Sequence, residues 1–243
     1  MRAAPVGEPA AVPCTTTQCE LGEGVRWDAR RDELLRVDIT AGTVFRDRVE
    51  TDGGLTPVRS YTVDEPVGAI APIHGDGGWL LAAGRGILHL APDGSTRSVA
   101  TDVTPSGTRM NDAACDPHGR LWAGTMADDH HTAGGGLHRL GRDGRIEQVM
   151  DGLTISNGLG WSPDGATMFL ADSGPRVVRA YDFDGESGTL ARERTLVTLD
   201  QDLGAPDGLT VDQDGDLWVA VYGGGQVRRY SPDGVLRGVV SIP

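Results

Sequence analysis

The feature that most constrains the fold of this chain is an internal repeat. Five segments share one pattern: a short apolar strand, a turn usually built on Asp-Gly, a second strand that often carries Trp and Ala, and a Gly-containing turn into a third strand. They start at residues 23, 67, 111, 157 and 207, and they read EGVRWDARRDELLRVDI, VGAIAPIHGDGGWLLAAG, NDAACDPHGRLWAGTM, NGLGWSPDGATMFLADS and DGLTVDQDGDLWVAVYG. Self-similarity at a fixed period of this length is typical of repeat architectures.

Each repeat continues into a third strand, as in GILHLAPDG, GLHRLGRDG, VVRAYDFDG and QVRRYSPDG. A three- or four-stranded antiparallel meander of this length is a propeller blade. Stacked parallel β units could share the period, but the frequent hairpin turns favour up-and-down sheets. The sequence therefore predicts an all-β chain that forms a single β-propeller domain over residues 1–243, with a flexible N-terminus over residues 1–12.

The composition agrees with a turn-rich β protein. The 243 residues include 36 glycines, and 26 of the 35 acidic residues are Asp, which favours turns. All 22 basic residues are Arg and the formal charge is −13, so the chain lacks the basic surface that nucleic acids or anionic membranes attract. No apolar run approaches the ~18 residues of a membrane span. We therefore expect neither a nucleic-acid partner nor a membrane.

The three cysteines, Cys14, Cys19 and Cys115, lack the spacing of a metal site. The first residues, MRAAPVGEPAAVP, lack the charged and apolar regions of a signal peptide. These observations predict a cytoplasmic protein, and they leave its oligomeric state open.

Equivalent positions of the repeats suggest a functional site. In a propeller the first strand of each blade lines the central channel, so these positions form a ring. Four of the five, Glu23, Asn111, Asn157 and Asp207, carry side-chain oxygens. Grouping such oxygens is costly unless a positive charge lies among them, and carboxylate and carbonyl oxygens are what hard divalent cations prefer.

The segments LGEGVRWD, RMNDAACDPHGRLWAGTM, ISNGLGWSPDG and PDGLTVDQDGDLWVA resemble the regucalcin and gluconolactonase family of six-bladed propeller lactonases. The resemblance runs from about residue 14 to residue 240. It implies that Glu23, Asn157 and Asp207 are metal ligands, and that Asn111 and Arg109 contact the substrate. Asp129 aligns with an acidic, substrate-contacting position of some members.

The resemblance also implies an enzyme that opens a sugar-acid lactone by metal-dependent hydrolysis. Asp207 would transfer protons as well as bind the metal, and Arg109 would orient substrate oxygens through its planar guanidinium. One divalent ion is expected, with Ca²⁺ favoured and Zn²⁺, Mn²⁺ and Mg²⁺ as alternatives. No serine nucleophile motif of the GxSxG type is present.

The chain departs from the family in one respect. The period would begin a sixth repeat on the order of 45 to 50 residues after Asp207, whereas the sequence ends at Pro243. The expected fold is therefore a propeller of the six-bladed family with five evident blades and the sixth missing or incomplete.

Two other functions compete with a sugar lactonase. Related propellers use a channel metal to hydrolyse other lactones or organophosphates, and a non-catalytic propeller that binds calcium or a protein is a further alternative. Fold alone does not distinguish them.

Overall fold

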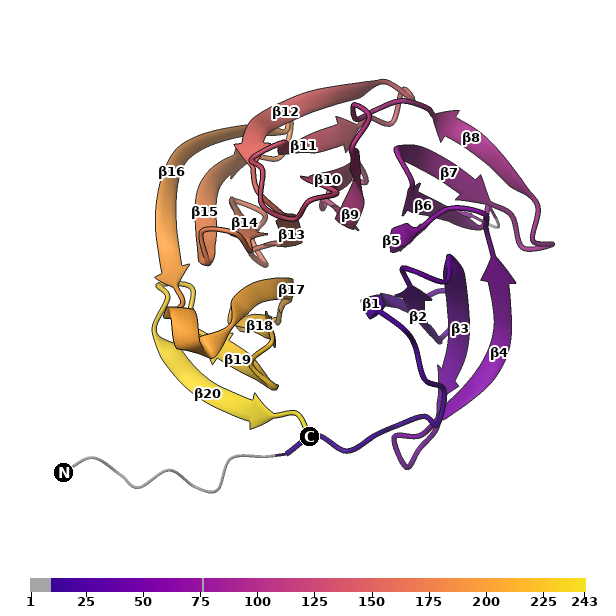
Figure 1. Ribbon diagram of the computed structural model, residues 1–243, viewed down its shortest axis with the longest axis horizontal. Coiled ribbons are helices and arrows are strands. Elements are labelled where there is room, and N and C mark those ends of the chain that lie inside the picture. Colours follow the sequence, from indigo (N-terminus) through magenta and orange to yellow (C-terminus); the bar gives the residue numbers. More distant parts are fainter. Residues whose placement is uncertain (1–9, 76) are drawn as a thin grey trace. The chain divides into compact units, whose positions relative to one another are not determined.

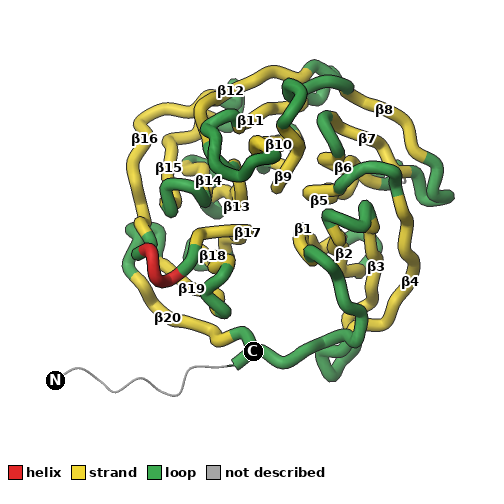
Figure 2. The backbone as a smooth tube through the Cα atoms, viewed as in Figure 1, coloured by secondary structure: helices red, strands yellow, loops and turns green. Residues whose placement is uncertain are grey.

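The computed structural model describes residues 10–75 and 77–243. Its twenty strands form five four-stranded antiparallel sheets, and in every sheet the strands follow one another in chain order (Figure 1). Each sheet is therefore the meander that the repeat predicts. Within the described residues the one helix is a 3-10 turn, Gln201–Leu203, and no helix is long and apolar enough to cross a membrane (Figure 2).

Contacts group the described residues into two units. The first unit, Cys14–Asn157, contains three sheets whose first strands, β1, β5 and β9, lie next to one another (Figure 1). The strands of these sheets are β1 Gly22–Asp28, β2 Glu33–Asp38, β3 Thr43–Val49 and β4 Leu55–Thr62; β5 Val67–Pro72, β6 Trp79–Ala83, β7 Gly86–Leu90 and β8 Thr96–Ala100; β9 Thr108–Cys115, β10 Leu121–Ala127, β11 Gly135–Leu140 and β12 Ile146–Leu153.

The second unit comprises Gly158–Pro243 and the described residues before Cys14. Its strands are β13 Ser156–Trp161, which begins just before the unit does, β14 Thr167–Asp172, β15 Val177–Asp184 and β16 Thr189–Thr198; β17 Ala205–Val211, β18 Leu217–Tyr222, β19 Gln226–Tyr230 and β20 Leu236–Ser241. Of the predicted flexible N-terminus, residues 1–9 lie outside the described residues. Beyond them, Ala10 forms a parallel bridge with Ser241 and the Ala11 N–H donates to the Ser241 carbonyl at 2.8 Å.

The Asp-containing turns are tied to the tryptophans of the following strands. In the turn between β9 and β10, Asp116 Oδ1 accepts the backbone N–H groups of His118 and Arg120, while Oδ2 accepts the indole N–H of Trp122 at 3.0 Å. Asp212 repeats the arrangement with Trp218, whose indole nitrogen is 2.9 Å away. One carboxylate thus closes a hairpin and satisfies an indole N–H.

These tryptophans contribute to the hydrophobic core. Trp79 and Trp122 are fully buried, and the indole of Trp79 donates to Asp28 across two neighbouring sheets of the first unit. Burial would raise the pKa of Asp28, but hydrogen bonds from Arg31 and Trp79 outweigh that effect and lower it. Sequence alternation explains the sheets, whereas these carboxylate–indole bonds connect the turns to the core.

We expect Asp116→Ala to lower the free energy of unfolding by about 2–4 kcal/mol, because it removes the acceptor of a buried indole and the partner of Arg120. Urea unfolding followed by fluorescence measures the change. The matched control is Asp143→Ala in an exposed turn, where the carboxylate accepts the Arg145 N–H and forms an exposed 3.7 Å ion pair with the same residue. The cost there should stay below about 1 kcal/mol. Equal losses in the two variants would contradict this account.

Candidate functional site

The first strands of four sheets are irregular at the predicted site positions. The pairing with the second strand shifts between Glu23 and Arg26 in β1, and between Pro206 and Leu209 in β17. It also shifts in β5, and in β9 opposite Gly124. A bulge places extra residues on one strand and redirects their side chains. The sequence analysis identified the positions but missed the bulges that direct them.

Glycines let neighbouring strands of the first unit approach one another by their backbones. A Cβ built on Gly68 in β5 would lie 2.2 Å from the carbonyl oxygen of Asn111 in β9. A Cβ on Gly124 would lie 2.5 Å from the hydroxyl oxygen of Ser156. Both distances are far below van der Waals contact, so glycine is required at each position.

Arg109 and Asn111 form one hydrogen-bonded group. Arg109 Nη1 donates to Asn111 Oδ1 at 3.0 Å and to the Met110 carbonyl at 2.9 Å. Asn111 Nδ2 donates to the Ser156 carbonyl at 3.1 Å. Asn111 and Asn157, which directly follows Ser156, are both buried. The amide orientation of Asn111 is therefore fixed, with its oxygen toward Arg109 and its nitrogen toward the strand that carries Asn157.

Two carboxylates act electrostatically on the charge of Arg109. Burial lowers the pKa of Arg109, and the negative charges of Asp128 and Glu23 act in the opposite direction. An arginine remains protonated at any physiological pH. The first unit thus brings together Glu23, Arg109 and Asn111 of the predicted site, around a guanidinium whose Nε and Nη2 have no hydrogen bond to described residues.

Asp129 is used by its own loop. Its Oδ1 accepts the backbone N–H groups of His131 at 2.9 Å and Thr132 at 2.8 Å, and its Oδ2 accepts the Thr132 hydroxyl. These bonds, that of the hydroxyl first, lower the pKa of Asp129 to about 2. The acid that acts on Arg109 is the neighbouring Asp128, which the sequence analysis missed. The structure distinguishes Asp128 because it directly follows Ala127, which pairs with Thr108 at the end of the β9–β10 ladder. Substrate contact by Asp129 stays a prediction.

Asp207 lies in the second unit, within the bulge of β17. A Cβ on Gly158, the residue that follows Asn157, would lie 2.5 Å from the Asp207 carbonyl oxygen. The preceding carbonyl, that of Pro206, accepts the buried Ser173 hydroxyl at 2.7 Å. The backbone around Asp207 is therefore fixed against the start of β13.

The chemistry of the predicted metal ligands fits a hard cation. Glu23, Asn157 and Asp207 offer two carboxylates and one amide oxygen, and such donors suit Ca²⁺, Mg²⁺ or Mn²⁺ better than Zn²⁺. Among the described residues no group of three or more His, Cys, Asp or Glu side chains is arranged to hold a metal ion. The predicted set has only two residues of those types.

The fold is that of an all-β propeller. A solved structure of the calcium-binding protein regucalcin from Agrobacterium tumefaciens superposes with a TM-score of 0.88 at 25% identity, covering 97% of this chain and 79% of that one. The described residues form five four-stranded sheets, as the five evident blades predicted. That a sixth blade of the family is missing or incomplete stays a prediction.

Sequence similarity shows the family to which the chain belongs. Residues 21–243 match the family described as the SMP-30/gluconolactonase/LRE-like region, and the chain belongs to that family. It is 36% identical over 227 residues to the pentonolactonase XacC of Haloferax volcanii, covering 93% of this chain and 75% of the relative. It is also 36% identical to the regucalcin of Xenopus laevis, covering 91% of this chain and 75% of the relative. The resemblance inferred from the motifs is confirmed.

We expect Gly124→Ala to cost about 1–3 kcal/mol of unfolding free energy, because the added methyl group collides with Ser156. The same collision should displace the Ser156 carbonyl and break its bond with Asn111, which a crystal structure of the variant would show. Gly238→Ala is the control, because a Cβ there meets nothing within 4 Å. An unchanged Asn111–Ser156 bond in a stable Gly124→Ala protein would contradict this packing argument.

Proposed function

We propose that the chain is a lactonase that hydrolyses the ester of a sugar-acid lactone, with one divalent ion, Ca²⁺ first among the candidates, bound by Glu23, Asn157 and Asp207. The observation that carries the proposal is the buried group of Arg109 and Asn111 beside the charge of Glu23. Membership of the SMP-30/gluconolactonase family supports the reaction class, and the name of the Haloferax relative supports a sugar lactone as substrate.

The side chains of the site divide the work of hydrolysis. Arg109 presents planar N–H donors to the substrate's oxygens, and Asn111 is fixed to contact the same ligand. Asp207 accepts a proton from the attacking water and returns one to the ring oxygen as the acyl C–O bond breaks. The product is the open hydroxy acid. A divalent ion would supply polarisation of the carbonyl and stabilisation of the developing oxyanion.

A charge argument supports the ligand set. Arg109 already faces Asp128 and Glu23, so its single positive charge is shared. The proposed ligand set adds a second carboxylate, Asp207, and two carboxylates in one set need a cation to offset their charge. The calcium-binding description of the Agrobacterium regucalcin agrees with a hard cation.

Asp207→Ala should lower lactone turnover at least about 100-fold, because it removes a proton acceptor and a metal ligand together. Turnover is measured by pH-stat on gluconolactone and pentonolactones, with metal-stripped protein before and after addition of each ion, and spontaneous hydrolysis is subtracted. Calorimetric Ca²⁺ titration should show weaker binding by the variant. Asp233→Ala, in an exposed turn of the same unit, is the control.

The assay also decides between the alternative functions. Calcium binding without turnover of any lactone would favour the non-catalytic alternative, and turnover of organophosphates or non-sugar lactones alone would reassign the substrate. Full activity of Asp207→Ala would remove this residue from the mechanism.

Arg109→Ala should reduce kcat/KM by about 10- to 100-fold, mainly through KM, because a charge-assisted hydrogen bond to the substrate is lost. Ca²⁺ affinity should not fall, because Arg109 is not among the proposed ligands. Steady-state kinetics on several lactones measures the first effect and calorimetry the second. Unchanged kinetics on every lactone would exclude Arg109 from the substrate site.

A further inference from the structure

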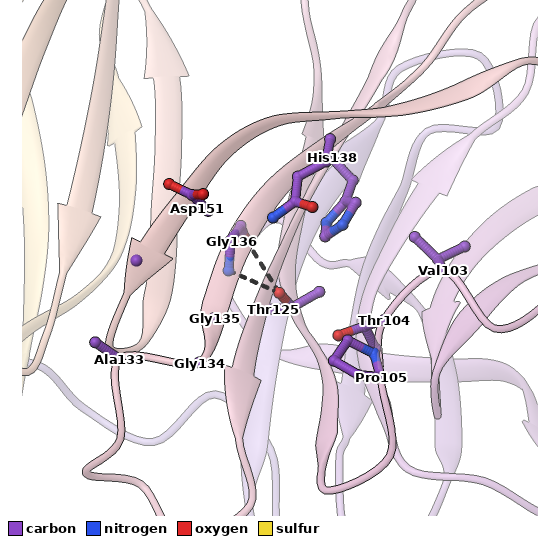
Figure 3. A pocket seen from close by; sticks show the side chains of 12 residues that line it. Val103, Thr104, Pro105, Thr125, Ala133, Gly134, Gly135, Gly136, His138 and Asp151 are labelled. Carbon is purple, nitrogen blue, oxygen red and sulfur yellow. Dashed lines mark hydrogen bonds between the residues drawn. The ribbon is translucent and has the colours of Figure 1, made fainter.

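The first unit contains a cavity that is lined by none of the proposed site residues. It has a volume of about 440 Å³ and lies between the segment that follows β8 and the strands β10, β11 and β12 (Figure 3). Small-molecule sites have volumes of roughly 300–1,000 Å³. None of the predicted metal or substrate residues lines this cavity.

A buried histidine points into the cavity. His138 in β11 is 6% exposed, and its Nδ1 is buried without a hydrogen-bond partner among the described residues. Figure 3 shows its imidazole directed toward the space bounded by Thr125, Thr104 and Val103. An unpartnered polar atom at such a depth is uncommon and requires an explanation.

The protonation state of His138 determines whether Nδ1 can accept a hydrogen bond. Burial lowers the pKa of the ring, and a hydrogen bond to the Ala123 backbone offsets this only in part, so the ring is neutral at pH 7. A hydrogen bond that stabilises the protonated imidazole must be donated by the ring. The N–H of the neutral ring is therefore directed to the backbone of Ala123. The lone pair on Nδ1 therefore has no partner among the described residues.

The rest of the lining mixes apolar residues with polar ones, Gln148 among them, and it contains no Arg or Lys. Thr125 Oγ1 accepts the Gly136 N–H at 2.8 Å and donates to the Gly136 carbonyl at 3.2 Å, which holds the hydroxyl in place. The acidic residue of the lining is Asp151. Arg85, which donates to the Thr104 carbonyl behind the wall, is paired with Asp102 at 2.7 Å. An anion would find no counter-charge here.

We propose that this cavity is a binding site for a neutral, hydroxyl-rich small molecule of monosaccharide size, one of whose hydroxyl groups donates to Nδ1 of His138. The site is additional to the proposed catalytic one and does not depend on lactonase activity. Hydroxyl groups both donate and accept, so they match the imidazole lone pair, the Asp151 carboxylate and the backbone of the glycine run 134–136. A carboxylate ligand matches none of these acceptors.

The test is calorimetric titration of the full chain with D-glucose as the neutral probe and gluconate as its anionic counterpart. Glucose should bind, gluconate should bind at least about tenfold more weakly, and His138→Leu should weaken glucose binding at least about tenfold. His118→Leu, at an exposed histidine outside the cavity, is the matched control and should bind like the parent. Ring-nitrogen NMR should show the Nδ1 resonance of His138 moving as glucose is added.

Two further variants keep the outcome interpretable. Ala133→Trp fills the cavity from an exposed position, so it should abolish glucose binding even if His138→Leu fails to fold. Arg109→Ala should bind glucose normally, because it alters only the proposed catalytic site. Loss of binding in Arg109→Ala but not in Ala133→Trp would assign the sugar to the catalytic site and overturn the proposal. Absence of glucose binding, or no movement of the Nδ1 resonance, would also overturn it and would assign the cavity to water.

Discussion

The close backbone approach of neighbouring strands at glycines is the constraint on which the rest of the structure depends. Gly68 lies against Asn111 and Gly124 against Ser156 in the first unit, and Gly158 lies against Asp207 in the second. At each place the backbone occupies the volume of a Cβ. Because the strands meet at main-chain distance, polar side chains beside the glycines are brought together without long side chains to span a gap. The bulges then direct those side chains away from the packed backbone.

The polar groups of the site are held mainly by main-chain carbonyls. Arg109 donates to the Met110 carbonyl and Asn111 donates to the Ser156 carbonyl. Carbonyls that belong to sheet ladders cannot reorient, so the guanidinium and the amide are fixed before any ligand arrives. Preorganised donors of this kind contribute most when charge develops on a bound ligand. The site therefore depends on the integrity of the ladders more than on side-chain packing.

The sequence predicted what is encoded locally. The repeat predicted antiparallel meanders of three or four strands in chain order, and it predicted Asp-Gly turns between them, because Asp and Gly act within a few residues. The bulges depend on the register between strands, so the sequence could not reveal them. Asp128 and Asp129 are adjacent acids that the motif alone cannot separate. Hydrogen bonds from Thr132 decide between them, since they hold Asp129 in its own turn and leave Asp128 acting on Arg109.

The cavity around His138 and the group around Arg109 share one ladder. Thr125, which lines the cavity, pairs with Met110, and the next residue, Met126, pairs with Arg109. Because successive residues of a strand point to opposite faces, the pairing of β9 with β10 supports both regions at once. A change that broke the backbone pairing of this ladder would disturb both regions, whereas a change of one side chain, such as Arg109→Ala or Ala133→Trp, alters one region alone. Side chains that alternate between the two faces of one strand pair thus keep the two polar regions apart.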